Sequence, residues 1–144
     1  VWERLMKVNL NSVMYGTRKA VRYFLDRGEG GVIIAVAGCA DGHGGEGFFK
    51  NIAENDPAAF ERSCIDRPKD QTLPDQWTAQ IFARILAHHP VILVSDLCDH
   101  DMIRAMHMTP ASTVDEAVQL ARELKGPNAR FAVIPDGLGV VVQR

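Results

Sequence analysis

The pattern of apolar and polar positions predicts helices that alternate with short apolar strands. Residues 3–26 carry apolar side chains at helical spacing and predict one long helix that ends at Gly28. The run Val32–Ala37 is continuously apolar and mostly β-branched, which is typical of a strand buried on both faces of a parallel sheet. Further strands are predicted at 91–94, 131–134 and 139–142.

Several helices are predicted between and after these strands. Thr72-Leu73-Pro74-Asp75 fits a capping box with an early proline, so we expect a helix from there to about Ala87. Ser112-x-x-Asp115 and Thr113-x-x-Glu116 are overlapping capping boxes for a helix that ends at Lys125 before Gly126-Pro127. Shorter helices are predicted at 48–53, at 57–65 and between His100 and His107.

This order of elements predicts a single α/β domain over residues 1–144, layered, with a mostly parallel sheet flanked by helices. Ligands of such sheets bind beyond the carboxyl ends of the strands. We therefore expect the glycine-rich loop 38–47, Ser95-Asp96 and Pro135-Asp136 to lie near one edge of the sheet.

Composition narrows the class of protein. Of the 144 residues 47% are hydrophobic and 24% charged, as in soluble globular proteins. The net charge is −2 with no basic cluster, which argues against nucleic-acid and membrane-surface partners, and no apolar run approaches a membrane span. Three widely spaced cysteines predict free buried thiols and a cytoplasmic location. Because the chain begins inside a predicted helix, we expect it to be a fragment.

The sequence contains few motifs that carry chemistry. Gly42-x-Gly44-x-x-Gly47 matches the dinucleotide fingerprint, but four residues separate Gly42 from the strand end, so a structural or substrate-shaping loop is the favoured interpretation. No two of the five histidines lie four residues apart on one helix, which predicts no zinc site of that type. Each histidine is expected to be structural or exposed.

Five stretches together resemble the C-terminal domain of the nickel-pincer lactate racemase family. They are Gly30–Gly38 (GGVIIAVAG), Asp41–Phe48 (DGHGGEGF), Pro74–Arg84 (PDQWTAQIFAR), Val94–Asp96 and Val133–Gly139 (VIPDGLG). They occur in order and cover about residues 30–144.

The resemblance implies an isomerase that interconverts D- and L-lactate by hydride transfer to a nickel pincer nucleotide. In that family the residues that hold the cofactor and the acid/base histidines belong to an N-terminal domain, so the implied partners are that domain and a small 2-hydroxyacid. No catalytic, cofactor-binding or metal-binding residue is implied in this chain. We expect the chain to be inactive alone.

Two substrate-binding residues are implied by the same resemblance. Trp77, in Pro-Asp-Gln-Trp, is similar to the tryptophan that lines the lactate pocket, and the alternative is a tryptophan of the core. The family has a glutamine and a lysine before the first of these strands, where this chain has Met14–Lys19. Arg18 or Lys19 is the candidate to replace that lysine, and Arg18 is taken as the second substrate-binding residue beside Trp77.

The first part of the chain resembles a second family. Trp2–Gly16 (WERLMKVNLNSVMYG), running into the strand up to Ala37, is similar to the fourth helix and fifth strand of short-chain dehydrogenases, with Asn9 at the position of their catalytic asparagine. The serine of that family is not found after the strand, where the chain has Gly38-Cys39-Ala40. We therefore expect residues 1–29 to form a dehydrogenase-like helix joined to a racemase-like domain over residues 30–144. The alternatives are therefore an inert chimeric fragment or a remnant of an NAD(P)-dependent dehydrogenase.

Overall fold

A parallel sheet of three strands lies at the centre of the protein. The computed structural model describes residues 31–134, so the predicted helix 3–26 and strand 139–142 lie outside the described residues. The strands are β1 (Ile33–Val36), β2 (Val91–Val94) and β3 (Thr109–Ala111), in the order β1-β2-β3. Both pairings are parallel, with Ile34 opposite Ile92 and Leu93 opposite Pro110. The predicted α/β class with a parallel sheet is confirmed.

The alternation of side chains along β2 divides the interior into two cores. All four residues of β2 are buried. Successive side chains of a strand point to opposite faces, so Val91 and Leu93 join one apolar cluster while Ile92 and Val94 join the other. The strand thus has helices on both of its faces, as its continuous apolar sequence predicts.

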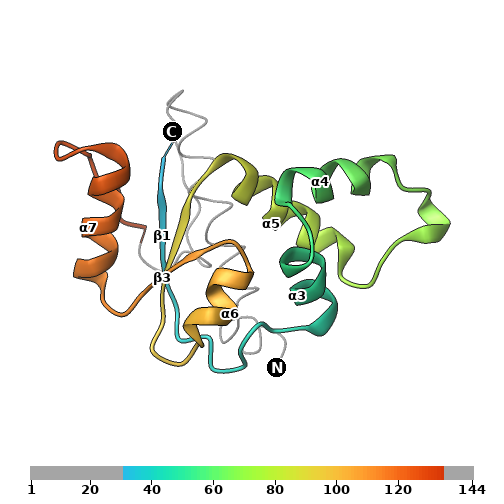
Figure 1. Cartoon of the computed structure of the whole chain (residues 1–144), viewed down its shortest axis with the longest axis horizontal. Coiled ribbons are helices and arrows are strands. Elements are labelled where there is room, and N and C mark those ends of the chain that lie inside the picture. The colour runs from blue at the N-terminus through green and yellow to red at the C-terminus, as the bar shows by residue number, and fades with distance from the viewer. Residues whose placement is uncertain (1–30, 135–144) are drawn as a thin grey trace.

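Five α-helices surround this sheet within the described range (Figure 1). The side that carries α7 (Val114–Lys125) contributes Ala117 and Ala121 to the cluster with Ile92 and Val94. The larger core lies on the other side and includes Phe48 and Phe82. Its helices are α3 (Glu46–Ala53), α4 (Pro57–Asp66), α5 (Gln76–His88) and α6 (His100–Ala105), and a 3-10 turn, η1, spans Lys69–Gln71.

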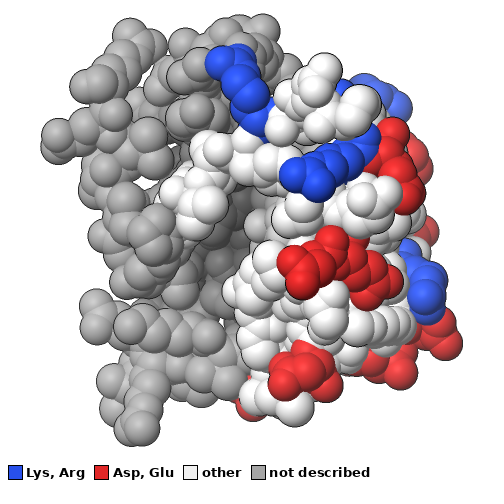
Figure 2. All heavy atoms as spheres, turned by 90° about the vertical axis from the view of Figure 1, so that its left-hand side faces the viewer, with Lys and Arg blue, Asp and Glu red and all other residues white. Residues whose placement is uncertain are grey.

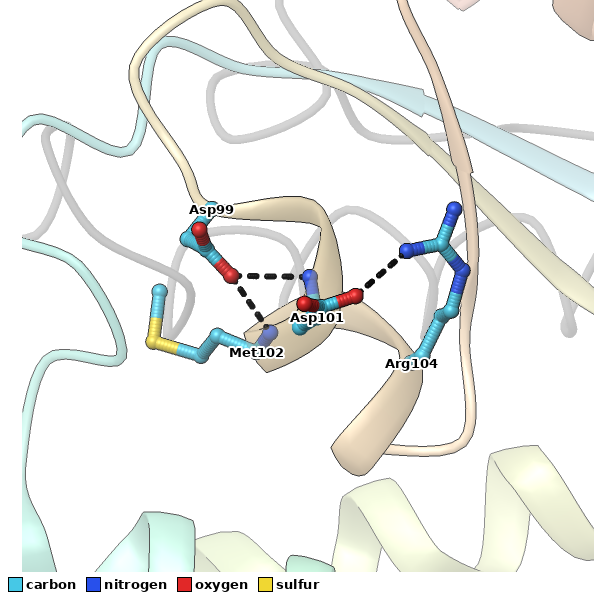
Figure 3. Close-up of polar contacts among 4 residues, drawn as sticks. All are labelled: Asp99, Asp101, Met102 and Arg104. Atoms are coloured by element: carbon cyan, nitrogen blue, oxygen red, sulfur yellow. Dashed lines mark hydrogen bonds and ion pairs between the residues drawn. The ribbon is translucent and has the colours of Figure 1, made fainter.

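Side-chain caps fix where three of these helices begin. Asp56 accepts a hydrogen bond from the Ala59 N–H and Thr113 accepts one from the Glu116 N–H. Asp99 caps α6 by accepting from the N–H groups of Asp101 (2.8 Å) and Met102 (3.0 Å), as Figure 3 shows. The predicted N-cap Thr113 is confirmed, whereas Ser112 lies outside the helix and donates its N–H to the Glu116 carboxylate.

Two strand predictions need correction. Residues 131–134 form no strand, and Phe131 and Val133 are exposed. The third strand is instead β3, whose three residues include Pro110. Proline has no N–H to donate to a sheet, and it is tolerated here because, within the described residues, β3 lies at an edge of the sheet.

Other elements also differ from the predictions in detail. β1 is not buried on both faces, since Ile33 is buried but Val36 is 65% exposed. The helix predicted from the Thr72 capping box begins only at Gln76, and the Thr72 hydroxyl donates to the Lys69 carbonyl of η1 instead. α3 begins at Glu46, two residues earlier than predicted, inside the glycine-rich loop.

Candidate functional site

The glycine-rich loop 38–45 crosses the carboxyl end of β1. Cys39, Gly42 and Gly44 have positive φ angles of 51°, 62° and 79°, and the Gly42 N–H donates to the Cys39 carbonyl at 2.9 Å. The Ser95 hydroxyl, which directly follows β2, donates to the Gly38 carbonyl at 2.9 Å. The structure therefore brings the loop and Ser95 together as predicted, whereas Pro135 and Asp136 lie outside the described residues.

His43 stabilises this loop from within. Its ring stacks on Phe49 with centroids 4.8 Å apart, and its Nδ1 accepts a hydrogen bond from the Gly45 N–H at 3.3 Å. Its Nε2 lies 3.6 Å from a carboxylate oxygen of Glu46. These contacts match the expected structural role, and residues 31–134 contain no group of three side chains that could hold a metal ion.

All three cysteines are free and buried, as predicted. The pKa of the Cys39 thiol is raised from 9.0 to about 11, chiefly by burial and also by the neighbouring Cys98. A hydrogen bond with Ser95 acts in the opposite direction and lowers this pKa. Burial likewise raises the pKa of Cys64 and of Cys98. Because the thiolate is the nucleophilic form, none of these cysteines is suited to covalent catalysis near neutral pH.

The candidate substrate residue, Trp77, lies at the start of α5, just after a turn. Asp75 adopts the left-handed conformation (φ 55°, ψ 15°), and Trp77 follows in the first turn of α5 with 59% of its surface exposed. This exposure rules out the alternative of a core tryptophan. The neighbouring Gln76 is buried, and its Oε1 accepts from the Leu73 N–H at 3.1 Å and from Arg67 Nη1 at 2.8 Å.

The glycine-rich loop and this turn meet at the N-terminus of α3. A Cβ added at Gly47 would lie 2.8 Å from Asp75 Oδ2, and one added at Gly45 would lie 3.5 Å from the same oxygen. The Asp75 carboxylate thus lies beside the first turn of α3, where a dinucleotide phosphate would have to bind. Two negative groups would repel each other there, so the geometry favours the structural interpretation of the glycine motif.

Sequence reasoning missed one residue of this site, Asn51. It is 9% exposed, and its Nδ2 donates to the Pro74 carbonyl at 2.8 Å. The sequence does contain a signal for this residue: Asn51 is a polar residue between Phe48 and Ile52 on the buried face of α3. A buried polar side chain of this kind usually has a specific hydrogen-bond partner. Arg18 and Lys19, the other predicted substrate contacts, lie outside the described residues.

On the side that carries α7, the described residues form no comparable arrangement of loop and turn. Figure 2 shows acidic and basic side chains interspersed on the side that carries α7. A shallow hollow there is lined by Gln119, Arg122, Glu123 and Pro127. Over the described part of the chain, no helix is long and apolar enough to cross a membrane.

The parallel sheet with helices on both faces defines an α/β domain. Comparison with known proteins identifies the family of this domain. The lactate racemase C-terminal domain family matches residues 13–142. The chain belongs to this family. The match begins inside the segment whose residues also resemble short-chain dehydrogenases.

Individual relatives confirm both resemblances. A lactate racemase of Lactiplantibacillus plantarum is 59% identical over 116 residues, which cover 80% of this chain and 27% of that protein. The structure of the lactate racemase apoprotein from Thermoanaerobacterium thermosaccharolyticum superposes with a TM-score of 0.82 at 39% identity, covering 96% of this chain and 33% of that one. A 3beta-hydroxysteroid dehydrogenase 2 of Eggerthella lenta is 75% identical over 66 residues, covering 37% of this chain and 25% of that protein. The chain therefore spans about a quarter to a third of the length of these relatives.

Proposed function

We propose that this chain is the C-terminal part of a lactate racemase-like isomerase that interconverts D- and L-lactate only with a cofactor-bearing N-terminal domain. The observation that carries the proposal is the family match over residues 13–142, supported by 59% identity to a lactate racemase. The small share of that relative covered, 27%, supports the requirement for a further domain. The free buried cysteines are consistent with a cytoplasmic location.

The nickel pincer nucleotide is not assigned to any residue of this chain. Residues 31–134 offer no cluster of histidine, cysteine and carboxylate ligands for nickel, so they do not fit the metal centre of that cofactor. That role belongs to the N-terminal domain of the proposed enzyme. What this chain contributes is a surface that contacts the 2-hydroxyacid.

Trp77 is the residue proposed to make that contact. An indole exposed at the start of a helix is available to a cleft shared with another domain, and it is large and apolar enough to exclude water from a small substrate. In the free chain this large apolar surface is in contact with water. Closing it against a neighbouring domain would bury that surface and stabilise the assembly.

Reconstitution tests the proposed function. The 144-residue chain is mixed with the cofactor-loaded N-terminal domain of a lactate racemase, and the conversion of L-lactate to D-lactate is followed by a chiral assay. We expect racemisation from the mixture and none from either part alone. Formation of a stable complex without racemisation would contradict the proposal and favour an inert chimeric fragment.

Replacement of Trp77 tests its role in the same mixture. We expect Trp77→Ala to lower kcat/KM strongly while changing the free energy of unfolding by only about 0.5 kcal/mol, because the side chain is exposed. Leu124→Ala is the matched control, since Leu124 is similarly exposed (56%) but lies on α7, across the sheet. Equal losses of activity and stability in Trp77→Ala would show that the indole has a structural role.

The second candidate function is that of a dehydrogenase remnant that binds NAD(H), and the 75% identity to a steroid dehydrogenase favours it. The residues after β1 argue against catalysis, because Gly38-Cys39-Ala40 does not supply the serine of that family. Titration of NADH fluorescence with the chain distinguishes the candidates. We expect no enhancement, and saturable enhancement would support the dehydrogenase alternative.

A further inference from the structure

Trp77 lies two residues after a turn with an unusual backbone conformation. The αL conformation of Asp75 reverses the chain immediately before α5, and residues other than glycine, asparagine and aspartate rarely adopt this conformation. Within α5, the Thr78 hydroxyl donates to the Asp75 carbonyl at 2.7 Å. An unusual backbone conformation persists only where its surroundings stabilise it. The conformation of Asp75 therefore depends on contacts from outside α5 as well as on the hydrogen bond from Thr78.

Those outside contacts come from α3. The buried Asn51 donates through Nδ2 to the Pro74 carbonyl, and this hydrogen bond joins residues 23 positions apart. At Gly47 the two segments approach so closely that a Cβ would lie 3.2 Å from both Cβ and the carbonyl oxygen of Pro74. The missing side chain at Gly47 thus makes room for the turn, and the amide of Asn51 fixes it.

The far end of α3 is held as well. His107 Nε2 lies 3.1 Å from the Ile52 carbonyl oxygen and 3.0 Å from that of Asn55. Since carbonyl oxygens only accept, this nitrogen carries the proton and donates to the last turn of α3. With one end bound by His107 and Phe48 buried against Phe82 of α5, α3 is a fixed support for the turn.

We propose that Gly47 and Asn51 are positioning residues that hold the Pro74-Asp75 turn and thereby aim Trp77 at the substrate. Only the aiming of Trp77 at the substrate rests on the proposed function, because the positioning of the indole can be measured without substrate. It gives the third glycine of the glycine-rich motif a role in aiming a distant side chain.

Time-resolved fluorescence anisotropy of the 144-residue chain tests the positioning. Trp2→Phe leaves Trp77 as the single tryptophan, and Gly47→Ala and Asn51→Asp are introduced in this background. Asn51→Asp replaces the donor with a carboxylate that faces the Pro74 carbonyl. We expect both variants to lose residual anisotropy, because the turn that restrains the indole is displaced.

Each variant has a matched control. Gly38→Ala adds the same methyl group where nothing lies within 4 Å. Asn55→Asp makes the same change just after α3, where the amide donates to the Asn51 carbonyl rather than to the Pro74-Asp75 turn. Neither control should change the anisotropy. Unchanged anisotropy in Gly47→Ala and Asn51→Asp, or equal changes in the controls, would overturn the proposal.

Gly47→Ala keeps the test decisive if Asn51→Asp fails to fold. Alanine favours a helix more than glycine does, but its methyl group would lie 2.8 Å from Asp75 Oδ2 and 3.2 Å from Pro74, so Gly47→Ala is expected to displace the turn rather than to unwind α3. The positioning proposal predicts a folded chain, by circular dichroism, in which Trp77 moves more freely.

Racemisation by the reconstituted mixture then distinguishes the positioning of Trp77 from its contact with the substrate. Misplacement of a substrate contact by 1 Å can lower the rate by about 10²-fold, so kcat/KM should fall in Gly47→Ala and Asn51→Asp but not in the controls. The anisotropy of the two variants could change while the unsubstituted chain shows no racemisation in the mixture. This result would support the positioning role and reject only the proposed function. Racemisation that Gly47→Ala leaves unchanged, despite freer Trp77 motion, would reject the aiming.

Discussion

At the scale of single residues, Cys39 combines an uncommon backbone conformation with a deeply buried thiol. Its side chain is 1% exposed at the carboxyl end of β1, and its φ of 51° begins the glycine-rich loop. The residue is therefore sensitive to any condition that favours the thiolate, because ionisation would place a charge where water is excluded.

The raised pKa of Cys39 predicts a loss of stability at alkaline pH. Between pH 9 and 11 the unfolded thiol loses its proton while the folded thiol retains it, so the free energy of unfolding falls as pH rises. The full shift corresponds to about 2–3 kcal/mol. Urea unfolding at pH 8 and pH 10.5 measures the effect, and Cys39→Ser, which has no ionising thiol, should lose less stability over this range. The same pH dependence in both proteins would exclude Cys39 as the cause.

At the scale of elements, the start of α7 illustrates how a local motif determines a helix. Thr113 accepts from the Glu116 N–H at 3.1 Å, and the Glu116 carboxylate accepts from the Ser112 N–H at 2.7 Å. The first bond satisfies a backbone donor that the first turn of a helix leaves without a partner, and the second gives an acceptor to the Ser112 N–H just before the N-cap.

Removal of the Thr113 hydroxyl should destabilise the chain. We expect Thr113→Ala to lower the free energy of unfolding by about 1 kcal/mol, since an N-cap side chain contributes roughly that amount. Ser112→Ala is the control, because only the backbone N–H of Ser112 takes part in the cap. Chemical denaturation measures both, and a loss in Ser112→Ala as large as that in Thr113→Ala would count against the assigned cap.

The elements that the sequence predicts well are those whose own residues determine them. β2 follows from four consecutive apolar residues and α7 from its capping residues. β3 was missed because three residues that include Pro110 carry no strand pattern, and pairing with β2 is what makes them a strand. Residues 131–134 have a strand pattern but no such pairing. At the candidate site, Trp77 followed from a family resemblance, whereas the roles proposed for Gly47 and Asn51 rest on contacts with Pro74, which is distant in the sequence.

At the scale of the whole molecule, β2 links the two cores. Its residues alternate between the cluster that contains Phe82 and the cluster covered by α7. A strand that serves both clusters leaves little opportunity for one to unfold alone, so the described part of the chain should unfold as one unit.

A substitution in one core should therefore be detected in the other. We expect Phe82→Ala to lower the free energy of unfolding by about 3–5 kcal/mol, because the buried ring is lost and a cavity remains. Hydrogen exchange should show faster exchange in α7 as well as in α5, although Phe82 contributes only to the other core. Undiminished protection of the α7 amides would show that the two cores unfold independently.

The contacts between α3 and the Pro74-Asp75 turn have a consequence for recombination between genes that encode such chains. The glycine at 47, the amide at 51, the turn at 74–75 and the indole at 77 lie in one uninterrupted stretch downstream of β1. A recombination event that exchanges everything before β1 would transfer this stretch whole. Genes could thus acquire a foreign segment upstream of β1 without separating the tryptophan from the residues proposed to support it.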